Sequence, residues 1–289
     1  MLELTNVSLT KGKKQILSEI NLSVGTGEVI CIIGKNGVGK TTFLKSVLGM
    51  TQLTAGKSLF KGVDMRSPER KNVVAEIGAM LYNDTYYDFL TGKENLETVR
   101  NFYVNPYFST NELLELFELK SVENQLVKTY SMGYKQRLLL AMSVVNCPAL
   151  VVWDEPFNSV DPTYSKWITH IIQHFQKTWN TSFLLTTHQT DGLEDIITRI
   201  IVLKKKSIQL DLILEKNAVY WFLEVKKNGK FSEIPVFQAS VHCIFDELDS
   251  CYKLISTENV EDFCIQNKLD KQMVVSHKPL KINEMYAFI

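Results

Sequence analysis

The residues best suited to chemistry form a glycine-rich stretch near the N-terminus, which fits the pattern G-x-x-x-x-G-K-[ST]. Glycines let the backbone bend tightly, so successive N–H groups can point into one concavity and hold phosphate oxygens. The Lys40 ammonium can reach the β- and γ-phosphates of a nucleotide, and the Thr41 hydroxyl is placed to ligate Mg²⁺. The stretch therefore predicts a phosphate-binding loop; the alternative is a glycine-rich turn without a ligand. Its residues are Gly34, Lys35, Asn36, Gly37, Val38, Gly39, Lys40, Thr41 and Thr42.

A second set of chemical groups follows an apolar run in the middle of the chain. Ala149–Trp153 is typical of a fully buried parallel strand, and Asp154 and Glu155 come directly after it. Open α/β sheets bind ligands at the carboxyl ends of their strands. In nucleotide hydrolysis, Asp154 would hold Mg²⁺ through water, and Glu155 would orient and partly deprotonate the attacking water. The alternative is that the two acids only cap the next loop.

Two weaker patterns favour the same chemistry. Ser131 can cap a helix that begins there, and Gly133 leaves its first turn open to a close approach. Such a helix N-terminus can hold a γ-phosphate through a hydroxyl, backbone N–H groups and the helix dipole. His188 follows the apolar run 183–185 and could hydrogen-bond the same phosphate. Taken singly, a plain helix start and a histidine without such a role are the alternatives.

The elements around these groups alternate between strand and helix, which predicts a mostly parallel sheet covered on both faces. The strand 29–33 precedes the loop, and a helix over 43–48 follows it. The alternation of residues 2–9 suggests an edge strand. Further strands are predicted at 16–24, 54–60, 77–81, 149–153, 182–186, 200–203 and 218–225. Helices are predicted near Pro68 and at 94–103, 111–119, 134–145, 163–177, 192–197, 258–268 and 280–289.

Size and composition limit the possible functions. A chain of 289 residues can hold one large α/β domain and a smaller appendage, or two modest domains. Lys+Arg and Asp+Glu each number 32, so the net charge gives no general attraction to nucleic acid. The five cysteines form no C-x-x-C pair and are expected to be reduced thiols in the cytosol. The longest apolar tract, 138–153, is interrupted, so any membrane part is expected on another chain.

The order of these motifs resembles the ATPase subunits of ABC transporters. The Walker A motif of that family matches 34–42, and its signature motif matches 130–134. Walker B with its glutamate matches 150–155, the D-loop matches 158–161, and the switch histidine matches His188. The likeness covers about residues 1–205.

The resemblance implies the fold of an ABC-type P-loop NTPase: a mostly parallel core sheet, a small antiparallel β subdomain and a helical subdomain. We expect the ATPase domain over 1–206, the helical subdomain over about 83–146, and a small α+β accessory domain over 207–289.

The resemblance also implies ATP and Mg²⁺ as cofactors, with Glu155, His188 and Lys40 as catalytic residues and Thr41 and Asp154 on the metal. Two such subunits, identical or different, pack head to tail around ATP. The groups that one subunit presents to the nucleotide of the other would be Ser131, Met132, Gly133 and Asp161. A separate integral membrane permease is the further partner, so the chain is expected on the cytoplasmic face of the cell membrane.

The sequence departs from the family pattern at three places. Tyr82 stands where the family's Q-loop glutamine touches Mg²⁺ and the water, so the Tyr82 loop is a candidate metal contact. The aromatic residue that stacks on adenine is absent near Lys11, and the stem of Lys11 or Lys13 is expected to replace it. The signature motif has Met132 and Tyr134 instead of its first glycine and its glutamine.

Several phrases are similar to a narrower group, the bacterial exporters of bacitracin, lantibiotics and related amphipathic peptides, including the staphylococcal phenol-soluble modulin exporter. These sequence segments are 77–80, 90–96, 130–137 and, near the C-terminus, 279–286. The sequence thus predicts the ATP-hydrolysing subunit of a peptide exporter. One alternative is a soluble ABC-type ATPase acting on DNA or ribosomes, although a second cassette and a heptad insertion are missing. The other is a weakly hydrolysing, nucleotide-gated regulatory subunit.

Overall fold

The computed structural model describes residues 1–81, 85–158, 162–187, 193, 195–215, 220–226, 241–246, 251–257, 259–266 and 274–279. The predictions at Tyr82, Asp161 and His188 lie outside the described residues. The predicted C-terminal helix 280–289 also lies outside them. Of the predicted helix 192–197, residues 193 and 195–197 are described, and they contain a turn at 195–196 instead of a helix.

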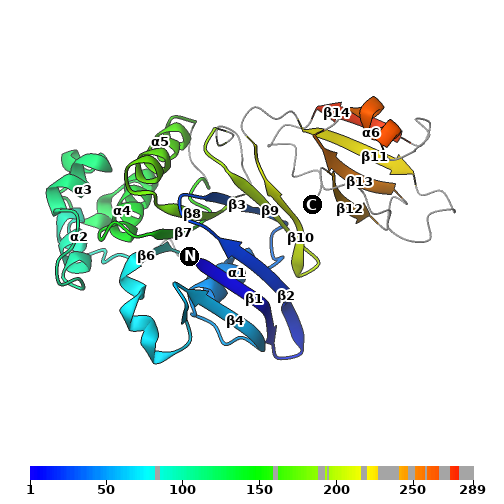
Figure 1. The fold of residues 1–289 in the computed structure, drawn as a ribbon. Helices are drawn as coiled ribbons and strands as arrows, with labels where there is room; N and C mark the ends of the chain where they lie inside the picture. Colours follow the sequence, from blue (N-terminus) through cyan, green and yellow to red (C-terminus); the bar gives the residue numbers. More distant parts are fainter. Residues whose placement is uncertain are drawn as a thin grey trace.

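A six-stranded sheet forms the centre of the molecule, in the order β10-β9-β3-β8-β7-β6 (Figure 1). Neighbouring strands from β9 to β6 run parallel, and β10 pairs antiparallel with β9. All five residues of β3 and of β8 are buried, as expected for apolar runs in a parallel sheet covered on both faces. The strands are β3 (Val29–Ile33), β6 (Ile77–Met80), β7 (Leu150–Asp154), β8 (Ser182–Thr186), β9 (Arg199–Lys204) and β10 (Ser207–Ile213).

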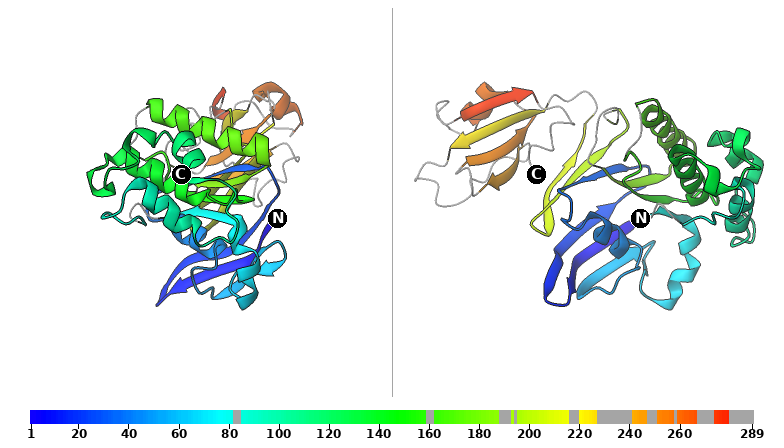
Figure 2. Two further views of the ribbon diagram at one scale, coloured as in Figure 1. Left: turned by 90° about the vertical axis from the view of Figure 1, so that its left-hand side faces the viewer. Right: turned by 180° about the vertical axis from the view of Figure 1, so that it is seen from behind.

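Helices and a second sheet cover this central sheet on opposite faces (Figure 2). Alternate residues of β3 point to opposite faces, so Cys31 packs into one hydrophobic cluster and Ile32 into the other. The first cluster includes side chains of α4 (Met132–Ser143) and α5 (Pro162–Trp179). The second includes side chains of α1 (Lys40–Val47) and of the antiparallel sheet. This three-layer arrangement is the α/β architecture predicted from the alternating pattern.

The antiparallel sheet has the order β2-β1-β4-β5. Because β1 pairs with β2 on one side and β4 on the other, the prediction of an edge strand at residues 2–9 is wrong. An alternating pattern shows that one face of a strand is buried, and this is true of inner strands and of edge strands alike. The second partner of β1, the strand β4, lies far along the chain, so the pattern near residues 2–9 gives no sign of it. The strands are β1 (Leu2–Lys11), β2 (Lys14–Val24), β4 (Ala55–Phe60) and β5 (Val63–Asp64).

The helical segment lies at the end of the molecule near β6 and packs against α4 (Figure 1). Its two helices each begin at a capping box, in which Thr91 or Ser109 exchanges hydrogen bonds with the glutamate three residues later. Near Pro68 the predicted helix forms as a 3-10 turn. The elements are α2 (Gly92–Arg100) and α3 (Thr110–Leu116), with the 3-10 turns η1 (Pro68–Asn72), η2 (Val74–Glu76), η3 (Lys120–Val122) and η4 (Val127–Thr129).

The C-terminal part forms a separate antiparallel sheet of order β12-β13-β11-β14 beside β10. Only β11 and α6 of its elements were predicted from the sequence. The predicted domain boundary at residue 206 falls within the β9–β10 hairpin, whose second strand still belongs to the central sheet. We therefore propose that the accessory domain begins after β10. Its elements are β11 (Trp221–Lys226), β12 (Val241–Asp246), β13 (Cys251–Ser256), α6 (Val260–Gln266) and β14 (Val274–Pro279).

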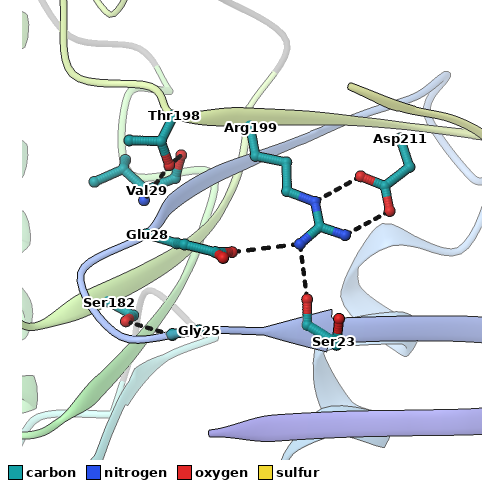
Figure 3. A network of polar contacts seen from close by, with 8 residues as sticks. All are labelled: Ser23, Gly25, Glu28, Val29, Ser182, Thr198, Arg199 and Asp211. Carbon is teal, nitrogen blue, oxygen red and sulfur yellow. Dashed lines mark hydrogen bonds and ion pairs between the residues drawn. The ribbon is translucent and has the colours of Figure 1, made fainter. Parts of the chain in front are cut away.

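One arginine joins the two N-terminal sheets (Figure 3). Arg199 at the start of β9 forms two parallel hydrogen bonds to Asp211 of β10, each of 2.6 Å. Its third nitrogen donates to the Ser23 carbonyl at 2.7 Å and lies 3.4 Å from Glu28 Oε2. The Asp211 carboxylate, followed by Glu28, raises the pKa of Arg199 and thus favours its charged form. The guanidinium therefore fixes β2 to the edge of the central sheet.

We expect Arg199→Ala to lower the free energy of unfolding by about 2 kcal/mol, because it leaves two acids and a carbonyl without their donor. Urea unfolding followed by circular dichroism measures this loss. Lys61→Ala is the matched control, since it removes an ion pair whose side chains are 44% and 41% exposed. A loss for Arg199→Ala no larger than that of the control would contradict a bracing role.

Candidate functional site

The phosphate loop connects β3 to α1 and needs glycine at defined positions. Gly39, the N-cap of α1, has φ +116°, a conformation that residues with a side chain rarely adopt. A Cβ atom on Gly34 would lie 2.6 Å from the carbonyl oxygen of Leu203 in β9. The loop therefore needs Gly39 for its backbone conformation and Gly34 for its close packing against β9.

The predicted loop residues and the predicted acids meet at the carboxyl ends of β3 and β7. The Thr41 hydroxyl donates to Asp154 Oδ2 at 2.5 Å. The Lys40 side chain is 7% exposed, and its Nζ donates to the Gly34 carbonyl at 2.8 Å and lies 3.3 Å from Glu155 Oε1. A cation, a hydroxyl and two carboxylates thus converge beside the glycine loop.

Sequence reasoning missed one residue that fixes these acids. The Thr186 hydroxyl, at the end of β8, donates to the second oxygen of Asp154. The Glu155 amide donates to both Oγ1 (2.9 Å) and the carbonyl (3.1 Å) of Thr186. Glu155 adopts φ +53°, so these bonds hold a strained backbone that directs its carboxylate. The only sequence indication is a threonine at the end of an apolar run.

A cavity of about 460 Å³ opens beside the loop. Ile16 lines it from β2, where sequence reasoning had expected Lys11 to contact the base. Lys11 is exposed at the end of β1 and is not among the lining residues. Val38, a predicted loop residue, does not line the cavity either, because its side chain packs into a hydrophobic cluster. The lining residues are Ile16, Asn36, Gly37, Gly39, Lys40, Thr41, Thr42, Glu155 and Asn158.

The signature segment lies on another surface of the chain. Ser131 caps α4 as predicted, accepting a hydrogen bond from the Tyr134 amide at 3.4 Å. Met132 is 68% exposed, and a Cβ atom on Gly133 would meet nothing within 4 Å. None of the three residues lines the cavity. The first turn of α4 is therefore open to a group from outside the chain. The buried Gln136 of α4 donates to the Pro156 carbonyl at 2.6 Å and so joins this helix to the segment that follows Glu155.

A buried thiol lies beneath the phosphate loop. Cys31 of β3 is fully buried, and burial, followed by the charge of Glu155, raises its pKa to about 12, although Lys40 lowers it in part. Because only the thiolate reacts with alkylating agents, this residue should be chemically inert in the folded chain.

We expect iodoacetamide at pH 8 to label Cys31 about a thousandfold more slowly in the folded protein than in urea, since the thiolate fraction falls with the raised pKa. Mass spectrometry of the labelled peptides measures both rates. The peptide of Cys147, whose pKa burial raises to about 11, provides an internal comparison and should label faster than Cys31. Rapid labelling of Cys31 in the folded chain would show that the site's interior is open to solvent.

The oxygens around Thr41 fit a magnesium ion. A hydroxyl and a carboxylate side by side are hard oxygen ligands of the kind that Mg²⁺ prefers, with water and substrate phosphates completing the shell. Within the described ranges, no group of three or more His, Cys, Asp or Glu side chains is arranged to hold a metal ion. No helix in the described part of the chain is both long and apolar enough to cross a membrane.

A glycine loop between a parallel strand and a helix, with an acid on a neighbouring strand beside its threonine, defines a P-loop nucleotide-binding protein. A family model described as ABC transporter matches residues 17–158. The lantibiotic transport ATP-binding protein SrtF of Streptococcus pyogenes is 30% identical over 196 residues, covering 68% of this chain and 83% of SrtF. The chain therefore belongs to the family of ABC transporter ATP-binding proteins.

Other comparisons agree with this family. The uncharacterized ABC transporter ATP-binding protein YdbJ of Bacillus subtilis is 33% identical over 205 residues, which cover 71% of this chain and 66% of YdbJ. The chain thus spans slightly under two thirds of that relative. The dimeric cassette MJ0796, in a post-hydrolysis state bound to ADP and Pi, superimposes with a TM-score of 0.67 at 23% identity. That match covers 74% of this chain and 99% of the cassette and bears out the predicted fold.

Proposed function

We propose that this chain is the ATP-hydrolysing subunit of an ABC exporter, which dimerises around two ATP molecules and drives a separate membrane subunit. The observation that supports this most is the meeting of four groups beside the glycine loop. Lys40, Thr41 and Glu155 line one cavity, and Asp154 accepts a hydrogen bond from Thr41. These four groups supply what hydrolysis of a phosphoanhydride needs: a cation for the phosphates, two magnesium ligands and a base.

Each residue has a part that follows from its chemistry. Backbone N–H groups of 34–42 and the Lys40 ammonium hold the β- and γ-phosphates. Thr41 and Asp154 would hold Mg²⁺, and the ion would supply positive charge for the phosphate oxygens. Glu155 accepts a hydrogen bond from the attacking water and takes up its proton as the bond from the water oxygen to the γ-phosphorus forms. The bond between the γ-phosphorus and the β,γ-bridging oxygen breaks at the same time, and ADP leaves. The Lys40 ammonium lies 3.3 Å from Glu155 Oε1, so the same cation that binds the phosphates also places this carboxylate beside them. His188 is proposed to orient the same water.

The second half of each site is proposed to come from another copy or a similar subunit. Ser131, Met132 and Gly133 lie outside the cavity of their own chain, and their helix N-terminus is open. A γ-phosphate bound at one phosphate loop would attract the dipole and hydroxyl of this turn in a facing subunit, and Asp161 would join that interface. Closing then depends on the nucleotide, since hydrolysis removes the charge that attracts the two copies.

Our proposal for the membrane partner and the cargo is based on the named relatives. A relative named a lantibiotic transport protein supports amphipathic peptides as cargo. The ATPase would then lie on the cytoplasmic face of the membrane beside an integral permease chain. The balanced charge of 32 basic and 32 acidic residues favours this protein partner over nucleic acid.

Two measurements test this function. ATP turnover by the purified protein should require Mg²⁺ and stop in excess EDTA, and permease reconstituted in vesicles should alter the rate. Affinity purification from native membranes should recover one hydrophobic permease chain. Tight binding of ATP without turnover, with or without that permease, would instead identify a regulatory subunit. Recovery of ribosomes or DNA without a membrane protein would overturn the exporter assignment.

A further inference from the structure

Tyr130, the residue before Ser131, is held in an unusually close contact. Its side chain is buried, and its ring lies against Gly92, the first residue of α2. A Cβ atom on Gly92 would lie 2.2 Å from the Tyr130 hydroxyl and 3.1 Å from the ring carbon that bears it. The hydroxyl donates to the Val122 carbonyl at 2.7 Å. Any larger residue at position 92 must therefore displace this ring.

Backbone hydrogen bonds make the surroundings of Tyr130 stiff. The Val127 amide donates to the Leu90 carbonyl at 2.9 Å, and the Lys128 amide donates to the Asp88 carbonyl at 3.0 Å. An isolated bridge pairs Thr91 with Leu126. The chain leading to Ser131 is thus bound to the start of α2, and the tyrosine ring closes this arrangement directly beside Ser131.

The hydroxyl of Tyr130 keeps its proton under working conditions. Burial raises the pKa of Tyr130 to about 12, so the group stays a neutral donor to the Val122 carbonyl at neutral pH. The hydrogen bond from Tyr130 to Val122 therefore keeps its donor at neutral pH.

We propose that Tyr130 is a positioning residue, whose fit against Gly92 and bond to Val122 set where Ser131 meets the nucleotide of a facing subunit. The inference rests on the proposed function, because Ser131 needs this placement only if it contacts ATP on another copy. A residue adjacent to Ser131 passes a displacement of its ring to the capping turn of α4. An error of about 1 Å there is enough to impair a site that depends on alignment.

The alternative is that Tyr130 is an ordinary core aromatic, and a pair of substitutions separates the two interpretations. Alanine favours helices more than glycine, so Gly92→Ala would benefit α2 if nothing opposed it. Its methyl group clashes mainly with the Tyr130 hydroxyl. Tyr130→Phe removes that oxygen and leaves a ring carbon at 3.1 Å, which a small shift accommodates. The second substitution should therefore rescue the first.

The experiment measures the ATP concentration that gives half-maximal dimer formation, by analytical ultracentrifugation in a Glu155→Gln parent that cannot hydrolyse. We expect Gly92→Ala to raise this concentration about tenfold and Tyr130→Phe about threefold. The double variant should return to within about twofold of Tyr130→Phe, a strongly non-additive result. ATP affinity of the dilute monomer should stay unchanged in all three variants.

Thr98→Ala is the matched control, because it removes an exposed hydroxyl bond to the Glu94 carbonyl in the same helix. It should leave dimer formation unchanged. If the Glu155→Gln parent itself fails to dimerise with ATP, the proposed function is wrong. If the parent dimerises and Gly92→Ala needs the same ATP concentration for half-maximal dimer formation, the positioning role is wrong. It is also wrong if the double variant needs as much ATP as Gly92→Ala. Should Gly92→Ala not fold, Tyr130→Phe alone decides, and an unchanged ATP requirement contradicts the proposal.

Discussion

Glu155→Gln is expected to retain ATP binding and to lose ATP turnover by about a thousandfold, the range that a positioned general base contributes. Glutamine has nearly the same shape as glutamate, so the backbone bonds from residue 155 to Thr186 can persist. The amide cannot take up the proton of the attacking water. Binding without hydrolysis should also trap the closed dimer, which gel filtration with MgATP would detect.

A suitable control is Glu76→Gln, which changes an exposed acid paired with Lys61 in the same way. It should leave turnover within about twofold of the unmodified protein, as expected for a surface pair. Normal phosphate release by Glu155→Gln would remove Glu155 from the catalytic role. Loss of ATP binding in that variant would show instead that the substitution disrupts the loop.

Lys40→Ala is expected to weaken ATP binding about a hundredfold, because a charge-assisted contact to the phosphates is lost. The Lys40 side chain is 7% exposed, and its Nζ lies between the Gly34 carbonyl and Glu155, so water cannot readily replace it. Its removal also leaves the Glu155 carboxylate facing the phosphates without a compensating cation. Isothermal titration with MgATP measures the affinity.

Lys35→Ala provides the comparison within the same loop. Lys35 is exposed and does not line the cavity, so its removal should change ATP affinity less than about threefold. Equal effects of the two substitutions would indicate a general attraction of basic residues for ATP. Unchanged affinity in Lys40→Ala would contradict the assignment of the phosphate loop.

The elements that hold the site could be predicted because their sequences are locally unambiguous. β3 and β7 are uninterrupted apolar runs that belong in a doubly covered sheet, and Ser131 is a capping residue before a helix. The inner position of β1 could not be predicted, since its partner β4 is distant in sequence. The C-terminal strand β14 also escaped, because its serine, histidine and proline give no clear period of two.

In the candidate site, too, features of short segments could be predicted, whereas contacts between segments distant in sequence could not. The spacing of Lys40 and Thr41 and the position of Asp154 after its strand are properties of short segments. The contacts of Thr186 and Ile16 depend on which strands are neighbours: β8 lies between β3 and β7, and β2 returns to the loop. Such adjacency is a property of the folded sheets.

The structure of Glu155→Gln with MgATP tests the central claim most directly. We predict two copies in which each triphosphate lies in the Gly34–Thr42 loop of one chain, with Ser131 and Gly133 of the other chain in hydrogen-bonding contact with its γ-phosphate. An empty loop at saturating ATP, or a bound nucleotide with Ser131 of every neighbouring copy far from it, would contradict the account.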